Sequence, residues 1–315
     1  HADNLLAMPD VRLKSVADPF LKPDEWSARG IAPTLDPDDV FNDPEIDAVL
    51  VCSPTPTHAD FTEIAARAGK HVFCEKPIAL DPDRIRKTLE VVETAGVKLQ
   101  VGFNRRFDPT FARVREAVVD GEIGDVHLVK VVARDPSPPP PEYVADSGGM
   151  FLDMTIHDFD MVRFLSGSEI EEVHAFGAVL IDPAIGEAGD IDTAVVTMKL
   201  KNGALAVIEN SRRAVFGYDQ RLEVFGSEGG VEAFNESPYQ VRTRTANGIR
   251  AENPLYFVLE RYQRSFVVEL EAFVASIRED RDPPVGGRDG LMSVLVGLAA
   301  AQSMAENRPV RVQAS

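Results

Sequence analysis

Residues 46–58 read IDAVLVCSPTPTH, an almost unbroken apolar run to Cys52 followed by serine, proline and threonine. An apolar run of this length, bounded by turn residues, is typical of a parallel strand that is covered on both faces. Residues 57–68, which follow it, have a helical pattern. A strand followed by a helix is the repeating unit of a doubly wound α/β sheet.

The same alternation continues on both sides of this unit. The expected elements are a strand over 11–17, a strand over 71–74, a helix over 81–95 that Asp81 caps, and a strand over 98–103. We therefore predict an α/β Rossmann-type doubly wound parallel sheet. Because the chain opens on the helix-like HADNLL, we expect a first strand and a glycine-rich turn to precede His1 rather than to be deleted.

After residue 120 the pattern changes to short strands separated by turns. A helix is expected over 109–119, followed by strands over 126–134, 173–180, 193–200, 204–210, 220–226 and 230–234, and by helices over 149–165, 257–278 and 287–307. This pattern predicts an α+β domain with a large, mostly antiparallel open sheet. We expect a dinucleotide-binding domain over 1–120, incomplete at its N-terminus, and a substrate-binding and oligomerisation domain over 121–315.

The composition disfavours several classes of function. The chain has 315 residues and a formal net charge of −18, which argues against nucleic acid and anionic membranes as partners. The longest apolar run near the C-terminus, 291–301, is too short to cross a bilayer, and no basic-then-apolar leader opens the chain. Cys52 and Cys74 are too few for a disulfide framework, so we expect reduced thiols and a cytoplasmic protein.

Polar residues follow the expected strands at their carboxyl ends, where open α/β sheets bind ligands. Asp18 closes the first of them; a carboxylate there accepts both ribose hydroxyls of NAD and repels a 2′-phosphate. The alternative is a surface aspartate in a turn. The other candidates for cofactor binding are Ser53, Pro54, Thr55, His58, Glu75, Lys76 and Asn104.

The helix after the first of these edges offers structural explanations for two residues. Thr57 is expected to cap that helix. His58 lies in its first turn, and we favour a structural role for it over contact with the cofactor.

The EKP sequence at 75–77 ends the strand over 71–74. The Lys76 ammonium can hydrogen-bond a substrate oxygen and stabilise a developing alkoxide. Pro77 restricts the backbone behind it, and the Lys76–Pro77 bond is a candidate for the cis form. A surface lysine is the usual alternative, but Glu75 and Pro77 on either side favour a function.

GFNRRFD (102–108) places two adjacent arginines after the last strand of this domain. Arg105 and Arg106 can face opposite ways, one toward solvent and one toward a substrate. A planar guanidinium suits polyol oxygens as well as carboxylates. An interdomain salt bridge is the alternative.

GGMFLDMTIHDFD (148–160) is the most informative stretch. On the helix expected over 149–165, Asp153 and His157 lie four residues apart on one face, and Asp160 joins the same face. An acid–base pair on an otherwise apolar helix suits removal of a proton from an alcohol, because histidine titrates near neutral pH. The alternative is a buried histidine that a neighbouring aspartate satisfies.

A metal site is the other interpretation of this stretch. His157 with Asp153, Asp158 and Asp160 could ligate zinc or manganese. No second histidine stands at ligand spacing nearby, and His127 and His174 belong to other expected strands, so we predict no metal.

Together these motifs resemble the glucose–fructose oxidoreductase / inositol dehydrogenase family of two-domain NAD(P)-dependent enzymes. The resemblance spans nearly the whole chain and is carried by CSPTPTH (52–58), CEKP (74–77), GFNRRFD (102–108) and GGMFLDMTIHDFD (148–160). Two further stretches, ARDPSPPPPEY (133–143) and GYDQRLEVFGSEG (217–229), are more similar to its inositol 2-dehydrogenase branch.

The resemblance implies roles for particular residues. Its catalytic lysine, aspartate and histidine fall on Lys76, Asp153 and His157, and its NAD-selecting acidic residue falls on Asp18. It also implies a homo-oligomer, a dimer or a tetramer. The positions that fall near the family's polyol pocket are Arg106, Asp160 and Tyr218.

The expected reaction is NAD-dependent oxidation of a ring hydroxyl, with myo-inositol to 2-keto-inositol as the first choice. His157 accepts the hydroxyl proton as hydride leaves the same carbon, and Lys76 stabilises the charge on oxygen. Asp153 either orients His157 or anchors a neighbouring hydroxyl. The alternatives are another inositol isomer or sugar, a non-catalytic NAD-dependent sensor on the same fold, and a metal-assisted hydrolase or lyase.

Overall fold

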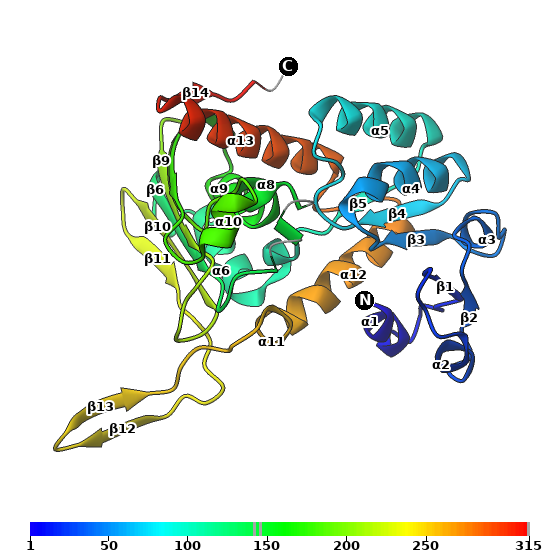
Figure 1. The fold of residues 1–315 in the computed structure, drawn as a ribbon, viewed down its shortest axis with the longest axis horizontal. Helices are drawn as coiled ribbons and strands as arrows, with labels where there is room; N and C mark the ends of the chain where they lie inside the picture. Colours follow the sequence, from blue (N-terminus) through cyan, green and yellow to red (C-terminus); the bar gives the residue numbers. More distant parts are fainter. Residues whose placement is uncertain (141–142, 145–146, 314–315) are drawn as a thin grey trace. The chain divides into compact units, whose positions relative to one another are not determined.

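A computed structural model describes residues 1–140, 143–144 and 147–313 (Figure 1). Pro141 and Glu142 of the ARDPSPPPPEY motif lie outside the described residues. The chain divides into two compact units. Unit 1 comprises His1–Phe103 and Phe266–Leu291, and unit 2 comprises Asn104–Ser265 and Met292–Ser315. The division expected near residue 120 concerns the functional domains and stays a prediction.

Unit 1 contains the predicted parallel strands. Strand β1 (Ser15–Ala17) pairs in parallel with β2 (Ala32–Thr34). A second sheet has the order β3-β4-β5 and consists of β3 (Ala48–Val51), β4 (His71–Cys74) and β5 (Leu99–Val101), all parallel. Parallel strands joined by helices confirm the Rossmann-type class.

The helices of unit 1 begin and end where their sequence dictates. Helix α4 (Thr55–Arg67) follows β3, and α5 (Pro82–Ala95) follows β4. The Asp81 side chain accepts the Asp83 N–H and so caps α5, as predicted, and Gly96 ends it with a positive φ of 68°. The three short helices are α1 (Ala2–Ala7), α2 (Pro23–Ser27) and α3 (Asp38–Phe41).

Unit 2 is built on a seven-stranded sheet with the order β11-β10-β6-β9-β8-β7-β14. All neighbouring pairs in it are antiparallel except β6 with β9, which confirms the predicted open, mostly antiparallel sheet. The strands are β6 (Val126–Arg134), β7 (Ile170–Ala178), β8 (Thr193–Leu200), β9 (Leu205–Ser211), β10 (Asp219–Gly226), β11 (Gly230–Ala233) and β14 (Val310–Arg311).

One face of this sheet is covered and the other is not. Helix α9 (Ile156–Ser166) packs against β6, and the Ser303 hydroxyl of α13 (Gly287–Glu306) accepts the Ala175 N–H of β7 (Figure 1). Side chains of β8 alternate strictly between buried and exposed.

The remaining elements are α6 (Pro109–Val119), α8 (Gly149–Asp153), α10 (Pro183–Glu187), β12 (Arg242–Thr245), β13 (Gly248–Ala251), α11 (Val258–Arg261) and α12 (Gln263–Arg278).

Two helices that the sequence predicts as continuous are broken. The helix expected over 149–165 is interrupted at Met154 and Thr155, and the one over 257–278 at Tyr262. Both the Met154 and Thr155 N–H groups donate to the Met150 carbonyl, at 3.0 and 2.9 Å. The second bond spans five residues, the spacing of a π-type turn, and such turns interrupt regular helix.

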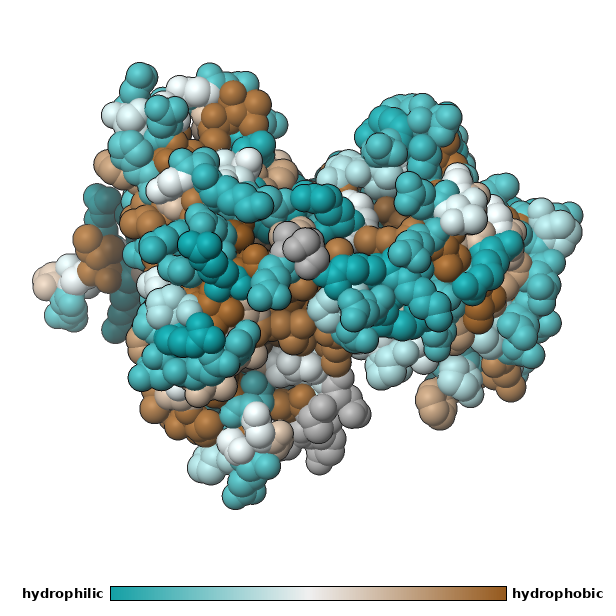
Figure 2. Space-filling view, turned by 90° about the horizontal axis from the view of Figure 1, so that it is seen from above, coloured by the Kyte–Doolittle hydropathy of each residue, from teal (hydrophilic) through white to brown (hydrophobic). Residues whose placement is uncertain are grey.

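On the face drawn in Figure 2, hydrophilic side chains predominate, with smaller hydrophobic areas among them. Within the described residues, every helix is too short or too polar to span a bilayer.

Candidate active site

The carboxyl end of β1 carries the acidic residue expected to select NAD. Asp18 is exposed, and its Oδ1 accepts the Phe20 N–H at 2.6 Å, which shapes the turn that follows β1. The turn therefore uses one oxygen of the carboxylate and leaves the group open to solvent. An exposed carboxylate at the end of a parallel strand has the acceptor chemistry that the two ribose hydroxyls of NAD require.

The end of β3 leads directly into α4. Pro54 is the N-cap residue of α4, and no side chain caps it, so the expectation that Thr57 caps this helix is wrong. Thr57 lies one turn further in because Thr55 and Pro56 already have helical geometry. Its hydroxyl donates to the Pro54 carbonyl at 2.8 Å and lies 2.6 Å from the Ser53 hydroxyl.

His58 is buried beneath the ends of β3 and β4. Its Nδ1 lies 2.8 Å from the Pro77 carbonyl oxygen, and its Nε2 lies 2.6 Å from the Ser53 carbonyl oxygen. The imidazole thus ties two strand ends together. This geometry supports the structural role that the sequence favoured for His58.

Glu75 and Lys76 end β4, and the Lys76–Pro77 peptide bond is cis, as the sequence suggested. The Glu75 N–H donates to the Val51 carbonyl at 3.0 Å. The Glu75 side chain also covers Gly102, where a Cβ atom would lie 2.7 Å from the Glu75 Oε2. Gly102 leaves room for this approach, so the Glu75 carboxyl group lies close to the end of β5.

In unit 2, Asp153 is the last residue of α8 and is half-buried. The Tyr143 hydroxyl donates to its Oδ1 at 3.0 Å, and the Arg212 Nη1 lies 3.6 Å from its Oδ2. Burial, followed by the charge of Asp153, raises the pKa of Tyr143, so this phenol stays a hydrogen-bond donor. Tyr143 and Arg212 are site residues that the sequence reasoning did not single out.

His157 lies in the first turn of α9 and is half-buried. Because α8 and α9 are separate helices, Asp153 and His157 do not share one continuous helical face, contrary to the expectation from their spacing. The break is fixed from outside the helix. The Thr155 hydroxyl donates to the Asn210 Oδ1 of β9 at 2.7 Å.

A buried charge network lies behind this break. The Asn210 Nδ2 donates to Asp158 at 2.7 Å, and the Arg105 guanidinium donates to the other oxygen of the same carboxylate. Both Arg105 and Asp158 are buried. Burial raises the pKa of Asp158 above its ordinary value, although Arg105 and Asn210 act to lower it. The network holds the start of α9, and therefore the backbone of His157, on β9.

The residues expected to line a polyol pocket are largely buried. Arg106 and Asp160 form a two-pronged pair with distances of 2.7 and 2.6 Å. Tyr218 packs edge-on against Tyr262, with ring centroids 6.0 Å apart. The buried Asn104 lies 3.5 Å from the Ser265 hydroxyl through its Nδ2. Their contact with substrate or cofactor stays a prediction.

The polar groups at the strand ends of unit 1 fit a dinucleotide. Carboxylate, hydroxyl and ammonium groups follow β1, β3 and β4 on Asp18, Ser53 and Lys76. These are the groups that ribose hydroxyls and the amide of a nicotinamide bind through hydrogen bonds.

Two family models match the chain. The model of the oxidoreductase family with an NAD-binding Rossmann fold covers residues 1–103, and that of the GFO/IDH/MocA C-terminal domain covers residues 111–232. The chain is 46% identical to a myo-inositol 2-dehydrogenase of Thermotoga maritima and 47% identical to an inositol 2-dehydrogenase of Rhizobium meliloti. Each alignment covers 99% of this chain and 95% of the relative.

A solved structure with ligands bound is also similar. The scyllo-inositol dehydrogenase of Lactobacillus casei with NAD(H) and scyllo-inositol has a TM-score of 0.91 and 32% identity, covering 99% of this chain and 95% of that one. The resemblance drawn from the motifs is thereby confirmed. The chain belongs to the GFO/IDH/MocA family of oxidoreductases and is an NAD-dependent enzyme.

Proposed function

We propose that this enzyme oxidises a ring secondary hydroxyl of a cyclic polyol, with myo-inositol to 2-keto-inositol as the reaction. The observation that carries the proposal is the polar surrounding of Asp153, at the end of the helix that precedes His157. Tyr143 and Arg212 add a donor and a positive charge beside Asp153, a set that suits a substrate with several hydroxyls. The two relatives at 46% and 47% identity, which are named for inositol, support the choice of substrate.

His157 is the proposed general base. A half-buried imidazole at a helix start can take the hydroxyl proton at neutral pH. NAD, when bound, accepts the hydride from the same carbon. The network of Arg105, Asp158 and Asn210 keeps the backbone of α9 in place during the transfer.

Lys76 is the proposed electrophile. Its ammonium stabilises the negative charge that develops on the substrate oxygen as the proton leaves. Asp153 has one of two roles, to orient His157 or to hold a neighbouring hydroxyl. Its contacts with Tyr143 and Arg212 suit the second role, because they hold the carboxylate in place through residues other than His157.

Cofactor choice is proposed to depend on Asp18. Its exposed carboxylate favours the ribose of NAD and repels the 2′-phosphate of NADP. Asp18→Ser should therefore raise the KM for NAD and improve the use of NADP. Equal use of both cofactors by the unchanged enzyme would contradict this role.

We also propose a homo-oligomer, a dimer or a tetramer, assembled on the open face of the unit 2 sheet. Phe225, Leu128 and Leu205 are exposed neighbours in one row across β10, β6 and β9, and Val195 and Phe176 form a second row across β8 and β7. An apolar face of this kind on a regular sheet suits a second copy of itself. Light scattering of Leu128→Arg/Leu205→Arg should show a smaller species than the unchanged protein.

A cytoplasmic location is proposed from the thiols. Cys52 and Cys74 are both free, and burial raises the pKa of the Cys74 thiol to about 12. A buried thiol of this kind is inert, and two free thiols suit a reducing compartment.

The decisive test is reduction of NAD by the purified enzyme with a panel of inositol isomers and aldoses, with NADP in parallel. Turnover with NAD and myo-inositol supports the proposal, and His157→Ala should then lower kcat by about 10²–10⁴-fold. Near wild-type turnover by His157→Ala would refute its role as base. Binding of NAD without turnover of any polyol would favour a sensor on the same fold.

A further inference from the structure

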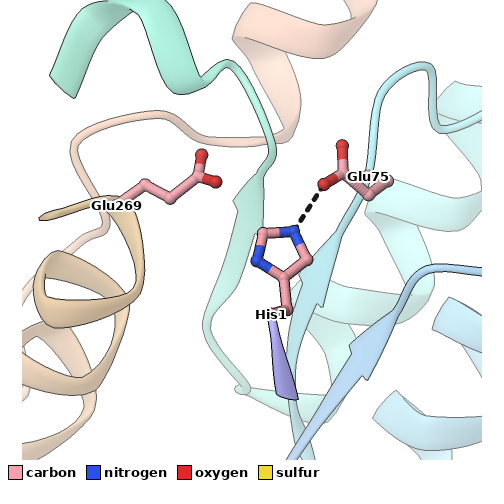
Figure 3. Close-up of side chains that lie close together, drawn as sticks. All are labelled: His1, Glu75 and Glu269. Carbon is pink, nitrogen blue, oxygen red and sulfur yellow. Dashed lines mark hydrogen bonds and ion pairs between the residues drawn. The ribbon is translucent and has the colours of Figure 1, made fainter. Parts of the chain in front are cut away.

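Unit 1 contains a cluster of three titratable side chains, of which only Glu75 has been considered above. His1 is the N-cap residue of α1, Glu75 follows β4, and Glu269 lies on α12 (Figure 3). One nitrogen or oxygen atom from each lies within 4.8 Å of the other two. The three residues are distant in sequence, so the fold alone brings them together.

The imidazole of His1 lies between the two carboxyl groups. Its Nε2 is 2.7 Å from the Glu75 Oε1, and in Figure 3 its other nitrogen is turned toward the side of Glu269. The rings of Phe73 and Phe266 contact it edge-on, with centroids 5.2 and 5.9 Å away. Aromatic packing and one short hydrogen bond therefore fix the orientation of the imidazole.

The side of the cluster around Glu269 is buried and polar. The His1 Nδ1 and both carboxyl oxygens of Glu269 are buried, and none has a hydrogen-bond partner within the part of the chain that the structure describes. Burial, followed by the charge of Glu75, raises the pKa of Glu269 well above its ordinary value. A buried carboxyl group in this situation holds a proton, and it can donate that proton toward His1.

Glu75 connects the cluster to Lys76. Its backbone N–H is bound to Val51, and its side chain lies against Gly102. His58 holds the carbonyl of Pro77 on the other side of Lys76. Lys76 is thus the middle residue of the segment 75–77. His1 holds this segment through the Glu75 side chain, and His58 holds it through the Pro77 carbonyl.

We propose that His1 is a positioning residue that acts through Glu75 on Lys76, with the Glu269 carboxyl group on the far side of the imidazole. The proposal rests on the proposed function only in assigning Lys76 to catalysis. Loss of the bond between His1 and Glu75 frees the Glu75 side chain to rotate. A displacement of the Lys76 ammonium follows, and small displacements of a catalytic group are costly in rate.

The first test compares His1→Leu with His1→Gln. Leucine fills space but cannot bind Glu75, whereas the glutamine amide can donate one hydrogen bond to it. We expect His1→Leu to lower kcat by about 10-fold or more with little change in the KM for NAD, and His1→Gln to recover most of the loss. Thermal unfolding of both variants shows that each is folded.

The second test is a double-mutant cycle of Glu75→Gln and Lys76→Met. If Glu75 acts through Lys76, its substitution lowers kcat in the wild-type background and has no further effect once Lys76 is replaced. Additive losses in the cycle would overturn the proposal. So would a stoichiometric divalent ion in metal analysis of the purified protein, because the cluster would then be a metal site.

A third measurement does not depend on turnover. The rate at which an imidoester modifies Lys76, followed by mass spectrometry, reports the environment of its amine, with the exposed Lys87 of α5 as the internal control. His1→Leu should change the Lys76 rate severalfold and leave that of Lys87 alone; unchanged rates at both would overturn the positioning role. If the wild-type enzyme oxidises no polyol, the proposed function fails while this rate still decides the positioning role.

Discussion

Unit 1 and unit 2 each bury a group of charges, but they satisfy them differently. In unit 2, Asp158 receives hydrogen bonds from both Arg105 and Asn210, so opposite charges and amides complete the group. In unit 1, Glu269 is a buried carboxyl with no hydrogen-bond partner among the described residues, and it lies beside Glu75, a second acid.

The difference separates two ways in which a fold can use a buried acid. A buried carboxyl group that is paired with a cation and an amide locks backbone geometry, here at the start of α9. An unpaired one stays protonated, and its neighbours respond to pH. Substitutions at four positions, taken in order of expected effect, test this contrast.

Arg105→Leu should have the largest effect on stability. It leaves the Asp158 carboxylate buried without its cation, and breaking such a pair by removing one partner costs about 3–5 kcal/mol. Urea unfolding at neutral pH measures the loss in free energy of unfolding. A loss well under about 1 kcal/mol would show that Asp158 is neutral in the folded protein.

Asp192→Asn should have the next largest effect. Asp192 is buried and accepts the N–H groups of Leu180, Ile181 and Asp182 at 2.8, 2.7 and 3.1 Å. The amide nitrogen of asparagine would face these donors, at a cost of about 1–3 kcal/mol.

The pH dependence of that loss has a definite sign. Burial acts to raise the pKa of Asp192, but the backbone donors outweigh it, so the pKa is lowered from 3.8. A lowered folded-state pKa gives stability that is present above 3.8 and is lost as pH falls through the folded value. The difference in free energy of unfolding between Asp192→Asn and the wild type should therefore shrink in acid. A difference that grows in acid would contradict the lowered pKa of Asp192.

Glu269→Gln should show the opposite sign. The folded-state pKa of Glu269 is raised above 4.5, so its contribution is fully present below 4.5 and is lost as pH rises through the folded value. The variant should be about as stable as wild type in acid and more stable near pH 8, by about 1 kcal/mol or more. Urea unfolding across this pH range measures the difference, and parallel stability curves for the two proteins would disprove the raised pKa.

Arg113→Leu should have the smallest effect and is the matched control for Arg105→Leu. Arg113 forms an ion pair with Glu122, and both side chains are about half-exposed. Water screens such a pair, so no measurable change in Tm is expected. A loss comparable to that of Arg105→Leu would mean that burial is not what separates the two pairs.

The sequence by itself determined the local structure. A continuous apolar run placed β3, turn residues separated the strands of the unit 2 sheet, and Asp81 fixed the start of α5. These features depend on residues next to one another in the chain, where the periods of strand and helix act directly. The motifs led in the same way to the family and to its NAD-binding fold.

The candidate site was predictable only as a set of residues. Lys76, Asp153 and His157 stand out by their motifs, and their catalytic roles stay predictions. Tyr143 and Arg212 carry no local signal, because an ordinary tyrosine or arginine at these positions looks like a surface residue in the sequence. Only the folded chain places them beside Asp153.

The tertiary structure alone decided the break between α8 and α9. Every residue from 149 to 165 is compatible with one helix, yet Thr155 is held by Asn210, a residue of β9. It also decided that His1, Glu75 and Glu269 meet, and that Asp158 is paired with Arg105. These contacts join positions far apart in the chain, so their energies exist only after the sheets and helices have packed, and no local pattern encodes them.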